Sequence, residues 1–265
     1  MKSYLADLII VNYNTQKYLR DCLESIIAFA DTAISTRVWV VDNGSTDGSV
    51  TLINRYRNRV KGIFNRKNLG YGAACNRGIL AGTGDYIFLL NSDTTVTAGW
   101  LAPLIKTLES SAQVAVVGPR LVNPAGLLVG VGVVGTNAHP VIRGWGEPNE
   151  PQRYNEPIET LSVGGACFGL KRRLIPELGL FDEHYFHYFE ETDYCYNARF
   201  HGYKVIYCPE STVIHRVLGS CQDVLKLRKY YREGEAYFQK KWRLFLKDET
   251  QYGQTIFNPA VTTRK

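Results

Sequence analysis

The sequence predicts an α/β fold with a doubly wound, mostly parallel central sheet. Three observations lead to this fold class: short apolar runs rich in β-branched residues alternate with segments of helical periodicity, the alternation repeats four times, and the connections are short. Apolar runs of this kind suit strands that are buried on both faces, because helices cover each side of such a sheet.

The alternating elements can be placed along the first half of the chain. Strands are expected at residues 7–13, 37–42, 62–65 and 86–90. Thr15 can cap the helix after the first strand, Thr46 and Asp47 can open the second helix, and the third helix is expected at residues 71–80. The first three strands therefore each lead into a helix, as parallel pairing requires.

After about residue 120 the alternation gives way to a less regular pattern. Residues 123–160 are rich in Gly, Pro and Asn and predict irregular strands and a long loop. Further elements are expected as helices at 171–178, 190–201 and 223–247 and as strands at 204–207 and 211–214. Because the sequence contains no linker or internal repeat, we expect a single domain over residues 1–265, made of a half at 1–120, a smaller mixed half at 121–222, and a C-terminal helix and tail at 223–265.

Composition excludes several classes of protein. With 265 residues, 45% apolar and 21% charged, the chain is too rich in apolar residues to be disordered and lacks the bias of collagen or a coiled coil. The net charge of +6 suits an anionic ligand or a membrane surface, but no long Lys/Arg block indicates a nucleic-acid partner. The sequence shows no signal peptide and no apolar run of about 18 residues, so we expect a soluble cytoplasmic protein.

The six cysteines are scattered along the chain and include no C-x-x-C pair. This spacing matches neither a disulfide framework nor a zinc finger. We therefore expect buried free thiols and a reducing compartment.

Polar clusters follow three of the predicted strands. They are Asn-Tyr-Asn at 12–14, Asp-Asn-Gly-Ser at 42–45 and Asn-Ser-Asp at 91–93. Any one cluster could simply cap a helix or form a turn. In an open parallel sheet, however, ligands bind at the carboxyl ends of the strands where the strand order reverses. Three clusters at such ends therefore predict a ligand site.

The ligand is expected to carry phosphate. Neither the dinucleotide fingerprint G-x-G-x-x-G after the first strand nor the phosphate loop G-x-x-x-x-G-K-[ST] is present. The alternative is a diphosphate neutralised by a divalent cation, and Mg²⁺ or Mn²⁺ often binds through one or two carboxylates plus substrate phosphates. Asp93, at the end of a buried strand, is well placed to hold that cation.

Seven segments, in the same order as in the family, resemble the family-2 glycosyltransferases, most closely the rhamnosyltransferase-like branch. They are 11–14 (VNYN), 41–49 (VDNGSTDGS), 68–79 (NLGYGAACNRGI), 88–94 (FLLNSDT), 164–173 (GGACFGLKRR), 181–195 (FDEHYFHYFEETDYC) and 213–220 (VIHRVLGS). The match covers roughly residues 7–245. The resemblance implies a GT-A fold, in which residues 1–120 bind the nucleotide-sugar and 121–222 bind the acceptor, and transfer of a sugar from a nucleoside diphosphate with inversion.

The resemblance also implies roles for individual residues in binding the donor. The implied donor-binding residues are Val11, Tyr13, Asp42, Asn68, Gly70, Asn76, Asn91, Ser92 and Asp93. Asp42 would accept a hydrogen bond from the base, whose imide N–H is a donor. Asn91–Ser92–Asp93 occupies the D-x-D position, where Asp93 would bind Mg²⁺ or Mn²⁺. Asn91 replaces the first Asp and lowers the negative charge of the site.

The catalytic residue implied by the resemblance is Glu191. The family pattern is Glu-Asp-x-Asp with the second residue as general base, and this chain has Glu-Glu-Thr-Asp at 190–193. Glu in place of Asp moves the carboxylate by about 1.5 Å. Taken alone, the run could be an acidic first turn that favours the helix dipole. Gly164, Gly165 and Glu190 would contact the acceptor, and His215 would complete the metal site or serve a structural role.

Substrates and partners follow from the same resemblance: dTDP-rhamnose or a UDP-sugar as donor, and a saccharide or lipid-linked saccharide as acceptor in cell-surface glycan assembly. A sugar-phosphate nucleotidyltransferase and a non-catalytic nucleotide-sugar-binding protein are the alternatives.

Two segments have open interpretations. His184 and His187 have metal-like spacing but lie among aromatic residues, which favours a pocket wall. The basic and aromatic residues of 223–247 fit either a membrane-surface helix at the inner face of the membrane or a docked helix that buries an aromatic stripe.

Overall fold

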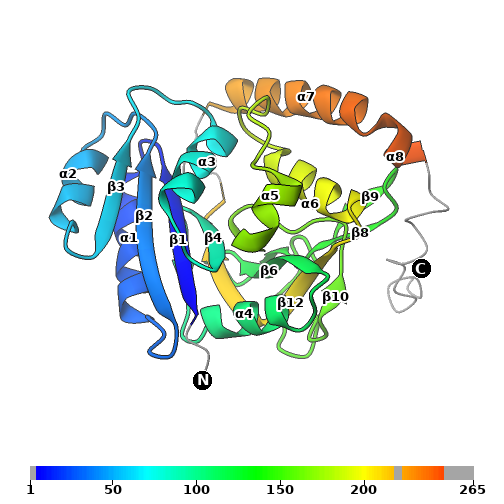
Figure 1. Ribbon diagram of the computed structural model, residues 1–265, viewed down its shortest axis with the longest axis horizontal. Helices are drawn as coiled ribbons and strands as arrows, with labels where there is room; N and C mark the ends of the chain where they lie inside the picture. The colour runs from blue at the N-terminus through cyan, green and yellow to red at the C-terminus, as the bar shows by residue number, and fades with distance from the viewer. Residues whose placement is uncertain (1–3, 218–222, 248–265) are drawn as a thin grey trace.

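The computed structural model describes residues 4–217 and 223–247 (Figure 1). Its strands are β1 (Leu5–Asn12), β2 (Ser35–Asp42), β3 (Val60–Phe64), β4 (Tyr86–Asn91), β5 (Thr94–Val96), β6 (Val114–Val122), β7 (Leu128–Gly130), β8 (Val133–Gly135), β9 (Pro140–Ile142), β10 (Ile158–Glu159), β11 (Cys167–Lys171) and β12 (Lys204–His215). Its helices are α1 (Gln16–Ala28), α2 (Ser49–Arg55), α3 (Tyr71–Ala81), α4 (Leu101–Glu109), the 3-10 turn η1 (Arg172–Leu174), α5 (Ile175–Leu178), α6 (Glu190–Phe200), α7 (Val224–Lys241) and α8 (Arg243–Lys247).

A ten-stranded sheet contains strands from both halves of the sequence. Its order is β10-β12-β6-β11-β4-β1-β2-β3, with β5 paired to β12 and β7 to β6. Strands β1 to β4 pair in parallel, as do β6 and β12, whereas β11 runs antiparallel between β4 and β6. The predicted α/β class with a mostly parallel central sheet is confirmed. Because β2 and β3 lie on one side of β1 and β4 on the other, the strand order reverses between β1 and β4.

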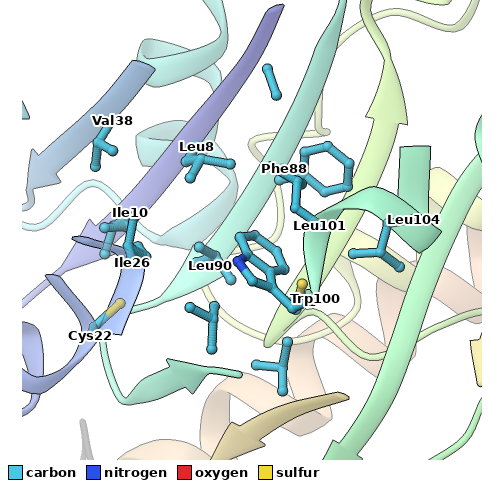
Figure 2. Close-up of a cluster of buried hydrophobic side chains, with 14 of the residues drawn as sticks. Leu8, Ile10, Cys22, Ile26, Val38, Phe88, Leu90, Trp100, Leu101 and Leu104 are labelled. Carbon is cyan, nitrogen blue, oxygen red and sulfur yellow. The ribbon is translucent and has the colours of Figure 1, made fainter. Parts of the chain in front are cut away.

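Alternate residues of the parallel strands point into two cores, one on each face of the sheet. Leu8 and Ile10 of β1 belong to the core shared with α1, α2 and α4, which Figure 2 shows around Trp100. Ile9 and Val11 belong to the opposite core, shared with α3, α5 and α6. Burial on both faces explains why these strands have continuous apolar sequences.

The first half of the chain follows the predicted order closely. The four predicted strands and the third helix form within two residues of their expected ends. Thr15 occupies the N-cap position of α1, but its hydroxyl donates to Asn12 Oδ1 at 2.7 Å and makes no capping bond. α2 begins at Ser49, later than expected, where Asp47 accepts a hydrogen bond from the Ser49 backbone amide at 3.1 Å. Thr15 therefore binds the end of β1, and Asp47 binds the start of α2 and also accepts from the Gln16 backbone amide at 2.8 Å.

The second half differs more from the expectations. The predicted helix at 171–178 is η1 followed by the short α5, and the sequence does not predict β6 and β11, whose residues are all buried. Gly118, Pro119 and Arg120 interrupt the apolar run of β6, and Gly169 and Lys171 interrupt that of β11, so neither segment has the uninterrupted apolar sequence that identifies a fully buried strand. The predicted strands at 204–207 and 211–214 are parts of β12, whose pairing with β6 shifts register between Cys208 and Thr212. The predicted helix at 223–247 is interrupted at Trp242.

The described cysteines are buried and free, as expected. They are Cys22, Cys75, Cys167, Cys195 and Cys208, and Cys221 lies outside the described residues. Burial raises the pKa of Cys22 to about 12, so its thiol is protonated and unreactive at neutral pH.

The helices α7 and α8 lie along the top of the molecule in Figure 1 and dock through aromatic side chains. Phe238, Trp242 and Phe245 form a buried cluster with Tyr185 and Tyr196. The interpretation of this segment as a docked helix is therefore confirmed for its aromatic face. Among the helices that the structure describes, none is both long and apolar enough to cross a membrane.

Candidate functional site

A pocket of about 130 Å³ lies where the strand order reverses, at the carboxyl ends of β1 and β4. Val11 and Asn91 are register partners in the β1–β4 pair and both line it. Its lining includes seven of the predicted donor-binding residues, namely Val11, Tyr13, Asn68, Gly70, Asn91, Ser92 and Asp93. The remaining lining residues are Asn43, Tyr71, Phe186, His187, Lys226, Leu227 and Tyr230.

The three polar clusters at the strand ends are bonded to one another. The Asn12 side-chain amide donates to Asp42 Oδ1 at 2.9 Å and to the Ser45 hydroxyl at 3.1 Å. The Ser45 backbone amide donates to Asp42 Oδ2 at 2.9 Å. The hydroxyls of Thr15 and Ser92 lie 2.7 Å apart and share a hydrogen bond. These bonds connect β1, the loop after β2 and the turn after β4.

Two predicted donor-binding residues, Asp42 and Asn76, lie outside the pocket lining. Asp42 is 1% exposed, and each of its oxygens already accepts a hydrogen bond from the network just described. The Asn76 side chain exchanges two 2.9 Å hydrogen bonds with the backbone of Phe181 and donates a third, also of 2.9 Å, to Glu183. Asn76 therefore holds the loop before α6, and the donor contacts of both residues stay predictions.

Asp93 and His215 place a buried carboxylate beside an imidazole. Asp93 is 3% exposed and lines the pocket, and its Oδ1 lies 3.3 Å from His215 Nε2. Among the described residues, neither Asp93 Oδ1 nor His215 Nδ1 has a hydrogen-bond partner. A buried oxygen without a donor, next to a ring nitrogen, is a ligand set that divalent cations accept. The two residues therefore fit a divalent metal ion.

Two protein ligands do not complete a metal site. Within residues 4–217 and 223–247, no group of three or more His, Cys, Asp and Glu could hold a metal ion. Mg²⁺ and Mn²⁺ commonly fill the remaining positions with water and substrate phosphates. A cation held by Asp93 and His215 would therefore bind best together with a phosphate ligand.

The far wall of the pocket comes from the loop before α6 and from α7. The Tyr71 backbone amide donates to the carbonyl of Phe186 at 2.8 Å. Gly70 has φ = 93°, and a Cβ there would lie 2.7 Å from the same carbonyl oxygen, so only glycine fits. The Phe186 ring stacks on Tyr230 of α7 with the centroids 4.6 Å apart. Lys226, on the same helix, adds a cation to the lining.

His187 also lies in this wall and is half-buried. Burial lowers its pKa to about 4, although the charge of Asp93 acts in the opposite direction. The ring is therefore neutral at physiological pH and can both donate and accept a hydrogen bond. His184 is exposed and stacks on Tyr237, with ring centroids 4.7 Å apart. The predicted pocket wall thus includes Phe186 and His187 but not His184.

Two glutamates begin α6 in a poorly solvated place. Glu190 is 3% exposed, and its Oε2 has no partner among the described residues. Burial, and then the neighbouring charge of Glu191, raise the pKa of Glu190 well above its usual range. Burial also raises the pKa of Glu191. A Cβ at Gly165 would lie 3.2 Å from the Glu191 carboxyl carbon, so glycine leaves room for that carboxyl group.

Two hydrogen bonds connect the pocket to the segment that contains Gly165. The Tyr71 hydroxyl donates to the Gly165 carbonyl at 3.2 Å, and the Asn91 backbone amide donates to the Ala166 carbonyl at 3.0 Å. Gly164 packs against Leu121, because a Cβ at position 164 would lie 2.8 Å from the Leu121 side chain. The structure therefore links the pocket to Glu191 through Tyr71 and Gly165.

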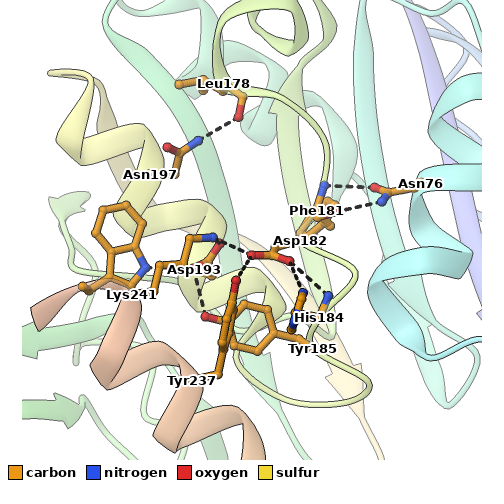
Figure 3. A network of polar contacts seen from close by, with 11 residues as sticks. Asn76, Leu178, Phe181, Asp182, His184, Tyr185, Asp193, Asn197, Tyr237 and Lys241 are labelled. Atoms are coloured by element: carbon orange, nitrogen blue, oxygen red, sulfur yellow. Dashed lines mark hydrogen bonds and ion pairs between the residues drawn. The ribbon is translucent and has the colours of Figure 1, made fainter.

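Asp193 connects the first turn of α6 to the end of α7 (Figure 3). Its Oδ1 accepts from the Tyr185 hydroxyl at 3.0 Å and from the Trp242 indole at 2.8 Å. Its Oδ2 accepts from the Lys241 ammonium at 2.9 Å, and the same ammonium donates to Asp182 at 2.7 Å. The acidic turn of α6 is thus held in place by the docked C-terminal helix.

Asp193→Ala should lower the free energy of unfolding by about 3 kcal/mol, because it leaves buried donors of Tyr185 and Trp242 without an acceptor. Urea unfolding measures the loss. Asp31→Ala, at a partly exposed position, is the matched control and should change stability little. Equal losses for the two variants would contradict the role of Asp193.

Sequence reasoning missed the lining residues from α3 and α7. Tyr71 lies inside the recognised segment 68–79, so its place in the motif could have suggested it. Lys226, Leu227 and Tyr230 belong to a helix whose position depends on the aromatic cluster, and no local pattern places that helix over the pocket.

Comparison with known proteins adds independent information. A family model described as "Glycosyl transferase family 2" matches residues 7–179. An N-acetylglucosaminyl-diphospho-decaprenol L-rhamnosyltransferase of Mycobacterium tuberculosis is 28% identical over 234 residues, which are 78% of this chain and 75% of that protein.

Solved structures with the same fold include two complexes. GalNAc-T7 with UDP, GalNAc and Mn²⁺ has a TM-score of 0.69 at 20% identity, covering 88% of this chain and 48% of that protein. The mannosyltransferase PcManGT of Pyrobaculum calidifontis, with GDP-Man and Mn²⁺, has a TM-score of 0.64 at 17% identity, covering 87% and 61%. The chain thus spans about half to three fifths of the length of these structures, and the fold is GT-A.

Proposed function

The chain belongs to glycosyl transferase family 2 and is a glycosyltransferase, and on this premise we propose that it transfers a sugar from a nucleoside diphosphate to a saccharide acceptor with inversion at the anomeric carbon. The observation that carries the proposal is the link between a pocket containing Asp93 and the half-buried Glu191, through Tyr71 and Gly165. In a single displacement, the acceptor oxygen attacks the anomeric carbon from the side opposite the leaving diphosphate. The base must therefore lie near the donor pocket, on the acceptor side of that carbon.

The donor occupies the pocket at the ends of β1 and β4. Val11, Tyr13 and Asn68 line the part that receives the nucleotide, and the diphosphate lies toward Asp93. Lys226 adds positive charge on the side of α7. Rhamnose is the proposed sugar, since the Mycobacterium tuberculosis relative is named as an L-rhamnosyltransferase. A thymidine or uridine diphosphate is the proposed carrier.

Asp93 and His215 hold Mg²⁺ or Mn²⁺ in this proposal. Support comes from the Asp93 oxygen, which accepts no hydrogen bond from the residues that the structure describes, and from the two structural neighbours, whose complexes contain Mn²⁺. When bound, the cation offsets negative charge on the departing diphosphate. Asn91 in place of a second carboxylate leaves the site less negative, so phosphate oxygens contribute more of the binding.

Glu191 is the proposed general base. It removes the proton from an acceptor hydroxyl, and that oxygen forms a bond to the anomeric carbon while the bond to the diphosphate breaks. The nucleoside diphosphate leaves with the electron pair of the broken bond. Poor solvation favours the protonated carboxyl group, which makes Glu191 a stronger base than an exposed glutamate. Gly165 and Glu190 border the acceptor in this arrangement.

The acceptor is a saccharide, for which we propose a lipid-linked form used in assembly of a cell-surface glycan. The support is again the relative, whose name describes an N-acetylglucosaminyl-diphospho-decaprenol substrate.

The proposal is tested by incubating the protein with a panel of dTDP-, UDP- and GDP-sugars and Mn²⁺. A cognate donor at 100 times its Kd should raise the melting temperature by about 5 °C. The same donor should release nucleoside diphosphate when a saccharide acceptor is added. Turnover of a nucleoside triphosphate with a sugar 1-phosphate would instead indicate a nucleotidyltransferase, and donor binding without release would indicate a binding protein.

A further inference from the structure

Positive charge is concentrated at the C-terminal end of the described chain. Residues 223–247 contain eight Lys and Arg and three Asp and Glu, a net charge of +5 compared with +6 for the whole sequence. The rest of the chain is therefore close to neutral. Most of the net positive charge, which favours an anionic partner, is therefore carried by α7 and α8.

The two faces of α7 have different chemistry. The inner face carries the buried Leu227 and Phe238, together with Tyr230, which lines the pocket. The opposite face carries four exposed cations, which we call the basic face: Arg228, Lys229, Arg232 and Lys240. In chain order, the spacings between these four residues are one, three and eight residues. At about 100° per residue, all four lie within about 120° of one another around the helix axis.

In Figure 1, α7 lies along the upper edge of the molecule. Because the inner-face residues Leu227 and Phe238 are buried and the four cations are exposed, the basic face is on the solvent side of the helix. Glu233 is also exposed on α7 and pairs with Lys229 at 3.8 Å as an i,i+4 contact. Surface pairs of this kind are weak, and three cations remain on the face besides Lys229. The helix is roughly 27 Å long, and it presents this charge along most of its length.

Exposed leucines accompany the cations. Leu225, one turn before Lys229, is 78% exposed, and Leu244 in α8 is 76% exposed. They are the two most exposed large hydrophobic residues in the part of the chain that the structure describes. Leu225 lies on the basic face, at the same angular position as Arg232 to within about 20°. Basic residues together with exposed leucines are typical of helices that lie on a membrane surface.

We propose that the basic face of α7, with Leu225 and Leu244, binds the surface of an anionic lipid bilayer. Lipid head groups neutralise the cations, and the two leucines enter the boundary between head groups and acyl chains. A polyanion such as nucleic acid could satisfy the charges, but it would leave both leucines in water. The chemistry of the face therefore favours lipid.

Membrane binding through this face would also orient the active site. The inner side of the same helix lines the pocket through Lys226, Leu227 and Tyr230. The pocket would consequently lie within one helix diameter, about 10 Å, of the bilayer surface. A lipid-linked acceptor could then reach it without leaving the membrane. This last step rests on the proposed function, whereas binding to lipid does not.

Flotation of the full chain with vesicles tests the proposal. Vesicles of phosphatidylcholine plus phosphatidylglycerol should bind the protein, and vesicles of phosphatidylcholine alone should not. Reversal of three cations of the basic face in one variant, Arg228→Glu, Lys229→Glu and Arg232→Glu combined, should weaken binding more than about tenfold. Leu225→Ser with Leu244→Ser should also weaken it, and higher salt should reduce binding by the native chain.

The matched control reverses three exposed cations elsewhere, Arg55, Arg57 and Arg59, which lie at and after the end of α2. This variant has the same net charge as the α7 variant and should bind vesicles as the native chain does. Circular dichroism and donor binding without lipid check that both variants are folded. Equal binding to neutral vesicles, equal loss in the control, or binding to duplex DNA in preference to anionic vesicles would each overturn the proposal.

Discussion

Glu191→Gln should lower kcat by about two to four orders of magnitude, because glutamine cannot accept the proton of the acceptor hydroxyl. The carboxyl group occupies the space left by Gly165, and glutamine has nearly the same shape, so the local packing should be kept. Donor affinity, measured by calorimetry, should be unchanged. Glu156→Gln, at an exposed position, is the matched control and should keep full activity.

The pH dependence provides a second measurement of the same role. Burial raises the pKa of Glu191, and the base works only when it is deprotonated. The value of kcat/KM should therefore rise with pH and level off above the raised pKa, with its acidic limb above the value of about 4.3 for a free glutamate. This limb should disappear in the residual activity of Glu191→Gln. Retained turnover with an unchanged pH profile would exclude Glu191 as the base.

Asp93→Ala should weaken donor binding in the presence of Mn²⁺ by more than about 100-fold. Removing a residue that hydrogen-bonds to a metal ligand already lowers metal affinity about 10- to 100-fold. Removing the ligand itself should lower the affinity at least as much. We expect this effect because Asp93 Oδ1 is buried and accepts no hydrogen bond from the described residues, so it is available to a cation. Calorimetry with and without EDTA measures the effect.

The comparison between variants makes the Asp93 experiment specific. EDTA should weaken donor binding to the native chain and leave binding to Asp93→Ala unchanged, since no metal-dependent part remains. His215→Ala should show a smaller loss, and Asp31→Ala, which lies away from the pocket, should behave as the native chain does. Native binding that is equally tight with EDTA would contradict the assignment of Asp93 and His215 to a metal.

Local sequence was a good guide where local chemistry decides the structure. The parallel strands have apolar β-branched sequences because both of their faces are covered, and this burial is visible as uninterrupted runs such as that around Ile9. The polar clusters predict a ligand site at the carboxyl ends of the strands, and Asn12, Asp42 and Ser45 are bonded to one another there. The antiparallel β11 was missed because Gly169 and Lys171 break its short sequence, which leaves no uninterrupted apolar run.

The sequence by itself therefore determined the α/β class, the strand ends that form the pocket, and, through the quoted motifs, the family. Only the tertiary structure decided that Asn76 holds a loop, that Tyr71 and Gly165 connect the pocket to Glu191, and that α7 covers one side of the pocket. These features depend on contacts between residues far apart in the chain. A periodic pattern reports which side of an element is buried, but it does not report which element buries it.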